Sequence, residues 1–173
     1  ICMESPFFFF ITSGNESEEK DLLSIVKDVP IFENLSNKAL KDIAKIVYRR
    51  EYKEGEIIFH KGDPGLGMYI IIDGTVDVVE DKEGKIIRKY ATLGANDFLG
   101  EMALLDEKAR SATAIVSEDC EALGFFRPDL MDFLRKKPKT GNIILYNLAR
   151  IIGERLRQSN AELIELQKKL NNG

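Results

Sequence analysis

A run of short strands separated by glycine turns occupies the middle of this 173-residue chain, between Arg49 and Arg127. Apolar and β-branched residues recur there in brief segments, each bounded by glycine, asparagine or aspartate. We expect strands at 56–60, 68–72, 75–80, 85–90, 112–117 and 121–126. The dipeptide Asp73-Gly74 predicts a tight turn between the second and third of them. Strands this short and this closely spaced favour a sandwich or a closed roll.

Helical patterns lie on both sides of the strands. Before them, apolar residues at helical spacing predict a helix over residues 18–29, and Ser36 is a suitable N-cap for a second helix. After them, Pro128 begins a short helix, which Pro138 and Gly141 are expected to interrupt. A long helix then follows over residues 142–170.

The long helix carries a heptad seam of about four repeats. Its two series are Ala149, Leu156, Leu163 and Leu170, and Leu145, Ile152, Ser159 and Leu166. Packing on the roll explains the first half of the seam. The second half is expected to pair with a second copy of the chain in a parallel two-fold homodimer. The alternative is a helix that folds back wholly on its own roll.

Composition limits the class of protein. Hydrophobic residues make up 44% of the chain and charged residues 31%, with a formal net charge of −4. This balance is typical of a globular protein and argues against a general nucleic-acid surface. Cys2 and Cys120 are the only cysteines, so we expect no disulfide framework and a reducing, cytoplasmic compartment. The phenylalanine run at 7–10 is too short to span a bilayer, and it predicts either a docked arm or a contact surface for a partner.

Residues 97–116 contain the groups needed to bind a small anionic ligand. Gly100 allows the backbone to approach a ligand closely, and a helical turn begins directly after it. The free amides at such a helix start attract an anion. The forked donors of Arg110 suit a phosphate, and Ser111 and Thr113 add hydroxyl groups. A plain Glu101–Arg110 ion pair around a turn is the alternative interpretation.

This stretch resembles the phosphate-binding cassette of the cyclic nucleotide-binding domain family. The matching residues are Phe98, Gly100, Glu101, Ala103, Leu104, Arg110, Ser111, Ala112 and Thr113. The resemblance implies that Glu101 accepts a hydrogen bond from the ribose 2′-hydroxyl and that Arg110 pairs with the cyclic phosphate. Backbone amides near Ala103 and Ser111 complete the cradle in this interpretation.

The resemblance extends beyond the cassette, to residues 31–170. It includes the glycine framework of the strands, such as Gly55, Gly62 and Gly74, and a helical lead-in that moves in the family when nucleotide binds. It also implies that Ser159 and Asn160 read the base, although Asn160 departs from the serine of the bacterial pattern. The residues expected to bind the ligand are thus Gly100, Glu101, Met102, Ala103, Arg110, Ser111, Ala112, Ser159 and Asn160.

The expected fold is mainly β, a double-stranded β-helix or jelly roll with flanking helices and a long C-terminal helix. We divide the chain into an N-terminal arm and linker at 1–17 and a cyclic nucleotide-binding domain at 18–173. Within the domain, the helical lead-in covers 18–48, the roll 49–127 and the C-terminal helices 128–171.

Catalysis is not expected. A metalloenzyme built on a β-roll needs several imidazoles, and His60 is the only histidine. The phosphate loop and the dinucleotide fingerprint are absent as well, and no nucleophile stands beside a base. We expect a sensor that binds cyclic AMP, with cyclic GMP as the second choice of ligand. We expect no metal and no nucleic acid bound by this chain alone, and the downstream partner is unknown. A protein-interaction scaffold, or the sensor half of a truncated transcription regulator or channel, is the alternative.

Overall fold

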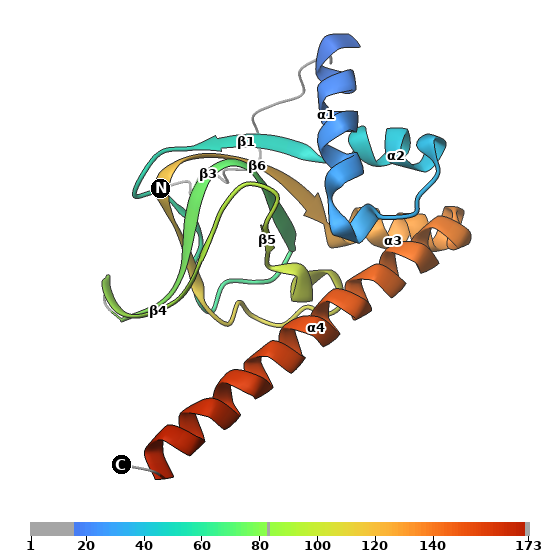
Figure 1. The fold of residues 1–173 in the computed structure, drawn as a ribbon. Coiled ribbons are helices and arrows are strands. Elements are labelled where there is room, and N and C mark those ends of the chain that lie inside the picture. Colours follow the sequence, from blue (N-terminus) through green and yellow to red (C-terminus); the bar gives the residue numbers. More distant parts are fainter. Residues whose placement is uncertain (1–15, 83, 172–173) are drawn as a thin grey trace.

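The computed structural model describes residues 16–82 and 84–171, which form a curled antiparallel sheet with helices gathered at one end (Figure 1). The strands are β1 (Tyr48–Tyr52), β2 (Ile57–Phe59), β3 (Gly67–Lys82), β4 (Lys85–Leu93), β5 (Phe98–Leu99) and β6 (Thr113–Phe126). The α-helices are α1 (Glu16–Asp28), α2 (Asn37–Ala44), α3 (Arg127–Lys136) and α4 (Pro138–Asn171). Two short 3-10 turns, η1 (Pro30–Phe32) and η2 (Glu101–Leu104), complete the elements. The expected jelly roll with flanking helices is confirmed.

Two long strands organise the sheet, whose order is β1-β6-β3-β4, with β2 paired to β6 and β5 paired to β3. The prediction of a tight turn at Asp73-Gly74 is wrong, because β3 runs through this dipeptide without a break. The register against β6 shifts on either side of Asp73, so the extra residue forms a bulge that bends the strand. Gly74 has φ +83, and a Cβ there would lie 2.1 Å from the Asp119 carbonyl oxygen. A glycine therefore marks a bend in a strand here, and the two segments expected at 112–117 and 121–126 are likewise one strand, β6.

The main hydrophobic core lies where the helices meet the open end of the roll. Side chains from α1, η1 and α2 pack there against α3, α4 and the nearby parts of β3 and β6. A second, smaller cluster lies inside the roll and includes Tyr52, Val76, Ala114 and Val116. The interior of the roll therefore holds a small apolar cluster, and the helices close one end of the roll.

Helix α4 begins earlier than expected, at Pro138, and continues for 34 residues. Gly141 lies inside α4, so the expected interruption is confined to Lys137, the C-cap of α3. A Cβ at Gly141 would lie 2.8 Å from Leu134 Cδ2, which shows that glycine permits the close approach of α3 and α4. From that contact α4 runs along the roll and extends beyond it (Figure 1).

Within 16–82 and 84–171, no helix combines the length and the apolar character needed to cross a membrane. The phenylalanine run at 7–10 lies outside the described residues.

Candidate functional site

The cassette turns sharply at a left-handed glycine. Strand β5 ends at Leu99, Gly100 takes φ +75, and the single turn η2 follows at once. A Cβ at Gly100 would lie 2.3 Å from Arg110 Nη1. The glycine therefore serves two purposes, since it permits the left-handed turn and leaves room for the arginine. The amide of Ala103, expected to face the ligand, donates to the Gly100 carbonyl at 3.1 Å.

Arg110 is buried under this turn, with 9% of its surface exposed. Its Nη1 donates to the Gly100 carbonyl at 3.1 Å and its Nη2 to the Gly67 carbonyl at 2.7 Å. The guanidinium carbon lies 4.1 Å from the centre of the Phe59 ring. Two carbonyls and an aromatic face thus fix the direction of the fork.

The charge of Arg110 is not neutralised. No carboxylate forms an ion pair with it within the described part of the chain, and its buried Nε has no hydrogen-bond partner. Burial lowers the pKa of Arg110, and the nearby Tyr69 and Asp63 oppose that shift. The guanidinium remains a cation because its ordinary pKa is so high. A buried, unpaired cation with a free donor is the arrangement that an anionic ligand would complete.

The backbone around Arg110 is also held. Its amide donates to the Asp63 carbonyl at 2.8 Å, and its carbonyl accepts from the Gly62 amide at 2.9 Å. These bonds join the end of the cassette to the loop after β2, so the arginine is placed by three separate segments of the roll.

Glu101 is buried as well, at 8% exposed, and its carboxylate is paired. Oε1 lies 2.8 Å from Nη1 of Arg155, a residue of α4. Arg155 also donates to the Phe98 carbonyl at 2.9 Å, and its guanidinium lies 4.5 Å from the centre of the Phe98 ring. The long helix therefore contacts the cassette on both sides of Gly100.

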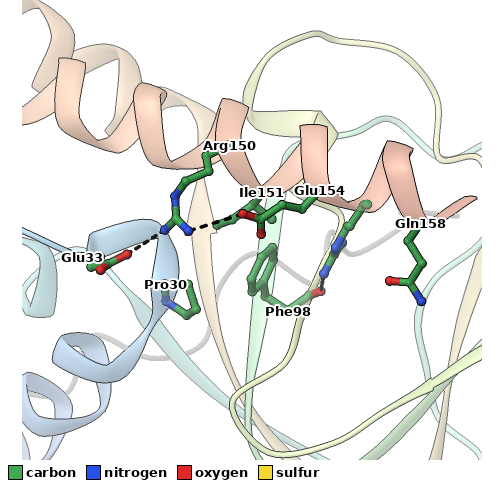
Figure 2. A pocket seen from close by; sticks show the side chains of 8 residues that line it. Pro30, Glu33, Phe98, Arg150, Ile151, Glu154 and Gln158 are labelled. Atoms are coloured by element: carbon green, nitrogen blue, oxygen red, sulfur yellow. Dashed lines mark hydrogen bonds and ion pairs between the residues drawn. The ribbon is translucent and has the colours of Figure 1, made fainter.

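A cleft of about 500 Å³ lies between residues 150–158 of α4, Phe98 and the turn at Pro30 and Glu33 (Figure 2). Its lining residues are Pro30, Glu33, Phe98, Arg150, Ile151, Glu154, Arg155 and Gln158. Arg150 crosses it with ion pairs to Glu33 at 2.6 Å and to Glu154 at 3.6 Å. Arg110 is not among the lining residues, so this cleft lies apart from the anion cradle.

The structure brings together only part of the expected ligand set. Gly100, Glu101, Ala103, Arg110 and Ala112 lie in the cassette, where the last four are buried. Met102 and Ser111 belong to the same stretch but face solvent. Ser159 and Asn160 are exposed on α4, four and five residues beyond Arg155, and stay predictions.

Sequence reasoning missed three contributors. Arg155 was visible in the run that precedes Ser159, but only the fold shows that it reaches Glu101. Phe59 and Gly67 hold Arg110 from strands far away in the sequence, and no local signal marked them.

Comparison with known proteins decides the family. Residues 49–137, just over half of the chain, match the family model described as "Cyclic nucleotide-binding domain". The chain belongs to this family. The whole cassette falls inside the matched residues, and so does the roll except for Tyr48, the first residue of β1.

Among relatives of this cyclic nucleotide-binding domain is the "Cyclic AMP receptor protein" of Thermus thermophilus, 36% identical over 138 residues. The match covers 80% of this chain and 62% of that protein. The "cAMP-dependent protein kinase regulatory subunit" of Schizosaccharomyces pombe is 29% identical, over 67% of this chain and 29% of the relative. The domain thus spans less than two thirds of the length of either relative.

Solved structures agree in fold. A crystal structure of a cyclic nucleotide-binding domain from Methylobacillus flagellatus has a TM-score of 0.73 at 27% identity, covering 87% of this chain and 85% of the other. The catabolite activator protein of Thermus thermophilus has a TM-score of 0.68 at 36% identity, covering 80% and 63%. Both solved structures therefore share the fold of this domain over at least four fifths of the chain.

Proposed function

We propose that this domain is a non-catalytic sensor that binds a cyclic nucleotide through Arg110 and Glu101. The observation that carries the proposal is the guanidinium of Arg110, which is buried, fixed by two carbonyls and free of any carboxylate partner within the described residues. An unmatched buried cation is costly for a protein to keep, and a bound phosphate would repay that cost. Gly100, Ala103, Ser111 and Ala112 form the surrounding cradle, with Met102 at its edge.

Cyclic AMP is the ligand that we propose first, and cyclic GMP second. The support comes from two relatives, a cyclic AMP receptor protein and a cAMP-dependent protein kinase regulatory subunit. Ser159 and Asn160 of α4 remain candidates to contact the base from the helix side. We place the protein in the cytoplasm, in keeping with its two cysteines.

The signal would pass through α4. Arg155 ties this helix to Glu101, the carboxylate assigned to the ribose, so a ligand hydroxyl must share or displace that contact. A ligand changes the position of α4 only if one position binds it better than the other. We propose that ligand binding repositions α4, and that the distal half of α4 forms a homodimer that carries the change to an unknown partner.

Calorimetric titration of cyclic AMP and cyclic GMP into the chain tests the proposal. Wild type should bind at least one of them at micromolar concentration or tighter, which corresponds to about −8 kcal/mol. Arg110→Ala should lose at least about ten-fold in affinity, since a hydrogen bond to a charged group contributes roughly 1.5–3 kcal/mol. Arg157→Ala, on the exposed surface of α4, is the matched control and should bind as wild type does. A folded protein that gives no heat with either nucleotide would instead support a scaffold that lacks ligand.

A further inference from the structure

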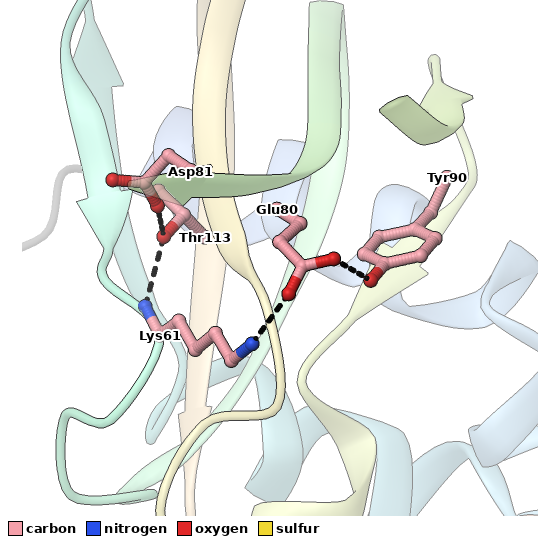
Figure 3. A network of polar contacts seen from close by, with 5 residues as sticks. All are labelled: Lys61, Glu80, Asp81, Tyr90 and Thr113. Atoms are coloured by element: carbon pink, nitrogen blue, oxygen red, sulfur yellow. Dashed lines mark hydrogen bonds and ion pairs between the residues drawn. The ribbon is translucent and has the colours of Figure 1, made fainter. Parts of the chain in front are cut away.

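Two side chains from separate segments meet on the carboxylate of Glu80 (Figure 3). Glu80 of β3 accepts from Lys61 Nζ at 2.9 Å through Oε1 and from the Tyr90 hydroxyl at 2.8 Å through Oε2. The backbone amide of Lys61 is bonded in turn to Thr113 Oγ1 at 2.9 Å. The network therefore joins the loop after β2 to β3, β4 and β6.

Glu80 lies on the same face of the sheet as the anion cradle. Phe59 is the register partner of Ala114, and Ala114 is the register partner of Val78. Directly paired residues share a face, and Glu80 shares the face of Val78 because it lies two positions further along β3. The guanidinium of Arg110 rests on the ring of Phe59, which places it on this face too. The path from Arg110 to Glu80 thus runs along the inner surface of the roll.

The network is connected to the cradle through the chain as well. Lys61 directly precedes Gly62, whose amide donates to the carbonyl of Arg110. Lys61 therefore links the backbone that holds Arg110 to the carboxylate of Glu80.

These groups have the chemistry to recognise a base. The three side chains are half-exposed, so the network is open to a ligand. A carboxylate accepts up to about four hydrogen bonds, and Glu80 uses two. Lys61 and Tyr90 lower the pKa of Glu80, which keeps it an acceptor at neutral pH. Purine bases offer amino and imino donors beside acceptors, a pattern that a carboxylate flanked by two donors can match.

We propose that Glu80, with Tyr90 and Lys61 beside it, reads the hydrogen-bonding edge of the base and sets the preference between purine cyclic nucleotides. This inference rests on the proposed function, because Arg110 and Glu101 must first hold the sugar and phosphate. Glu80 accepts from an amino or imino group of the base, and Tyr90 donates to a neighbouring acceptor. Both are specificity-determining residues for the same site.

The same hairpin offers a matched control on its other face. Asp77 of β3 accepts from Lys89 Nζ at 2.8 Å and from the Thr92 hydroxyl at 2.6 Å. It has the composition of the Glu80 network, one carboxylate, one lysine and one hydroxyl. Asp77 lies one residue from Val78, so the alternation of side chains along β3 places it on the face opposite to that of Glu80.

The test is calorimetric titration of cyclic AMP and cyclic GMP into wild type, Glu80→Gln, Tyr90→Phe and Asp77→Asn, with a thermal melt of each protein. Wild type should prefer one nucleotide. Glu80→Gln should reduce that preference at least about five-fold, the size of one net hydrogen bond. Tyr90→Phe should reduce it in the same direction, and Asp77→Asn should leave it unchanged.

Two results overturn the inference while leaving the proposed function intact. One is an equal loss of affinity for both nucleotides in Glu80→Gln, which would place the carboxylate near the sugar and phosphate. The other is a preference unchanged by Glu80→Gln and Tyr90→Phe, or changed equally by Asp77→Asn, which would assign only a structural role to the hairpin. If wild type binds neither nucleotide, the proposed function fails first, and the inference fails with it.

Discussion

Arg155 of α4 holds the carboxylate of Glu101 at 2.8 Å, although 54 residues separate the two in sequence. The same guanidinium donates to the Phe98 carbonyl and covers the Phe98 ring. One side chain thus binds the residues on both sides of Gly100. Arg155 therefore joins α4 directly to the cassette.

Arg155→Gln should loosen that link. Glu101 is buried and would lose its ion-pair partner, but Arg155 is itself half-exposed, so we expect a loss of about 1–2 kcal/mol in the free energy of unfolding. Urea unfolding measures it. Hydrogen exchange should also accelerate at the α4 amides beyond residue 155. Arg157→Gln is the control, and equal effects from both variants would show that the Glu101 contact has no special weight.

Gly100→Ala should weaken nucleotide binding at least about ten-fold in a titration. The left-handed backbone costs an alanine roughly 1–2 kcal/mol, and the added Cβ would lie 2.3 Å from Arg110 Nη1, so the fork must move. Gly55→Ala carries the same backbone cost, at φ +85, with nothing within 4 Å of the new Cβ. We expect Gly55→Ala to lower the melting temperature while keeping wild-type affinity. Similar affinities in the two variants would contradict the requirement for space at Gly100.

Asn147 connects α4 to the turn after α1. Its buried Nδ2 donates to the carbonyls of Ile31 at 3.2 Å and Glu33 at 2.8 Å. Asn147→Asp would aim a carboxylate at two carbonyl oxygens, which should cost about 3–5 kcal/mol of stability at pH 7. The new carboxyl would have a raised pKa in the folded state, so the loss should shrink as the pH falls and the group takes up a proton.

Urea unfolding at pH 7 and pH 5 measures the effect of Asn147→Asp. The exposed Asn142→Asp on the same helix provides the control, and it should change stability little at either pH. A loss in Asn147→Asp that is equal at the two pH values would argue against a buried, unpaired carboxylate.

The sequence predicts the β-rich roll better than it predicts where its strands and helices turn or end. Glycine turns and apolar patterns favour a sandwich or a closed roll, because those signals act over a few residues, and the family resemblance narrows this to the jelly roll that the structure confirms. Asp73-Gly74 misled because a glycine with positive φ serves a bulge as well as a hairpin, and only the register against β6 distinguishes the two. Gly141 misled for a related reason, since close packing against Leu134 favours glycine inside a helix.

The residues of the candidate site also fall into two groups, those visible in one short stretch of sequence and those that only the fold brings to it. Gly100, Glu101 and Arg110 were found from their spacing within one short stretch. Phe59 and Arg155 reach that stretch from β2 and from α4, so their roles depend on tertiary structure. Ser159 and Asn160 stay predictions, because both are exposed on α4.

The heptad seam of α4 leads to the last prediction. Leu145 and Ile152 pack against the main core, whereas Leu156, Leu163, Leu166 and Leu170 are between 51% and 81% exposed. A stripe of four exposed leucines on one helix is costly in water, and a parallel partner helix would bury it. We therefore expect wild type to be a dimer in sedimentation velocity at micromolar concentration.

Leu163→Glu combined with Leu166→Glu should give a monomer. Like charges would then face each other across the seam, and the core contacts of α4, which end near Ile152, would be untouched. The folded monomer should keep the circular dichroism spectrum of the roll. Gln167→Glu, an exposed change next to the seam, should remain dimeric. A wild-type protein that sediments as a monomer at every concentration would refute the dimer and leave the distal half of α4 without a partner of its own kind.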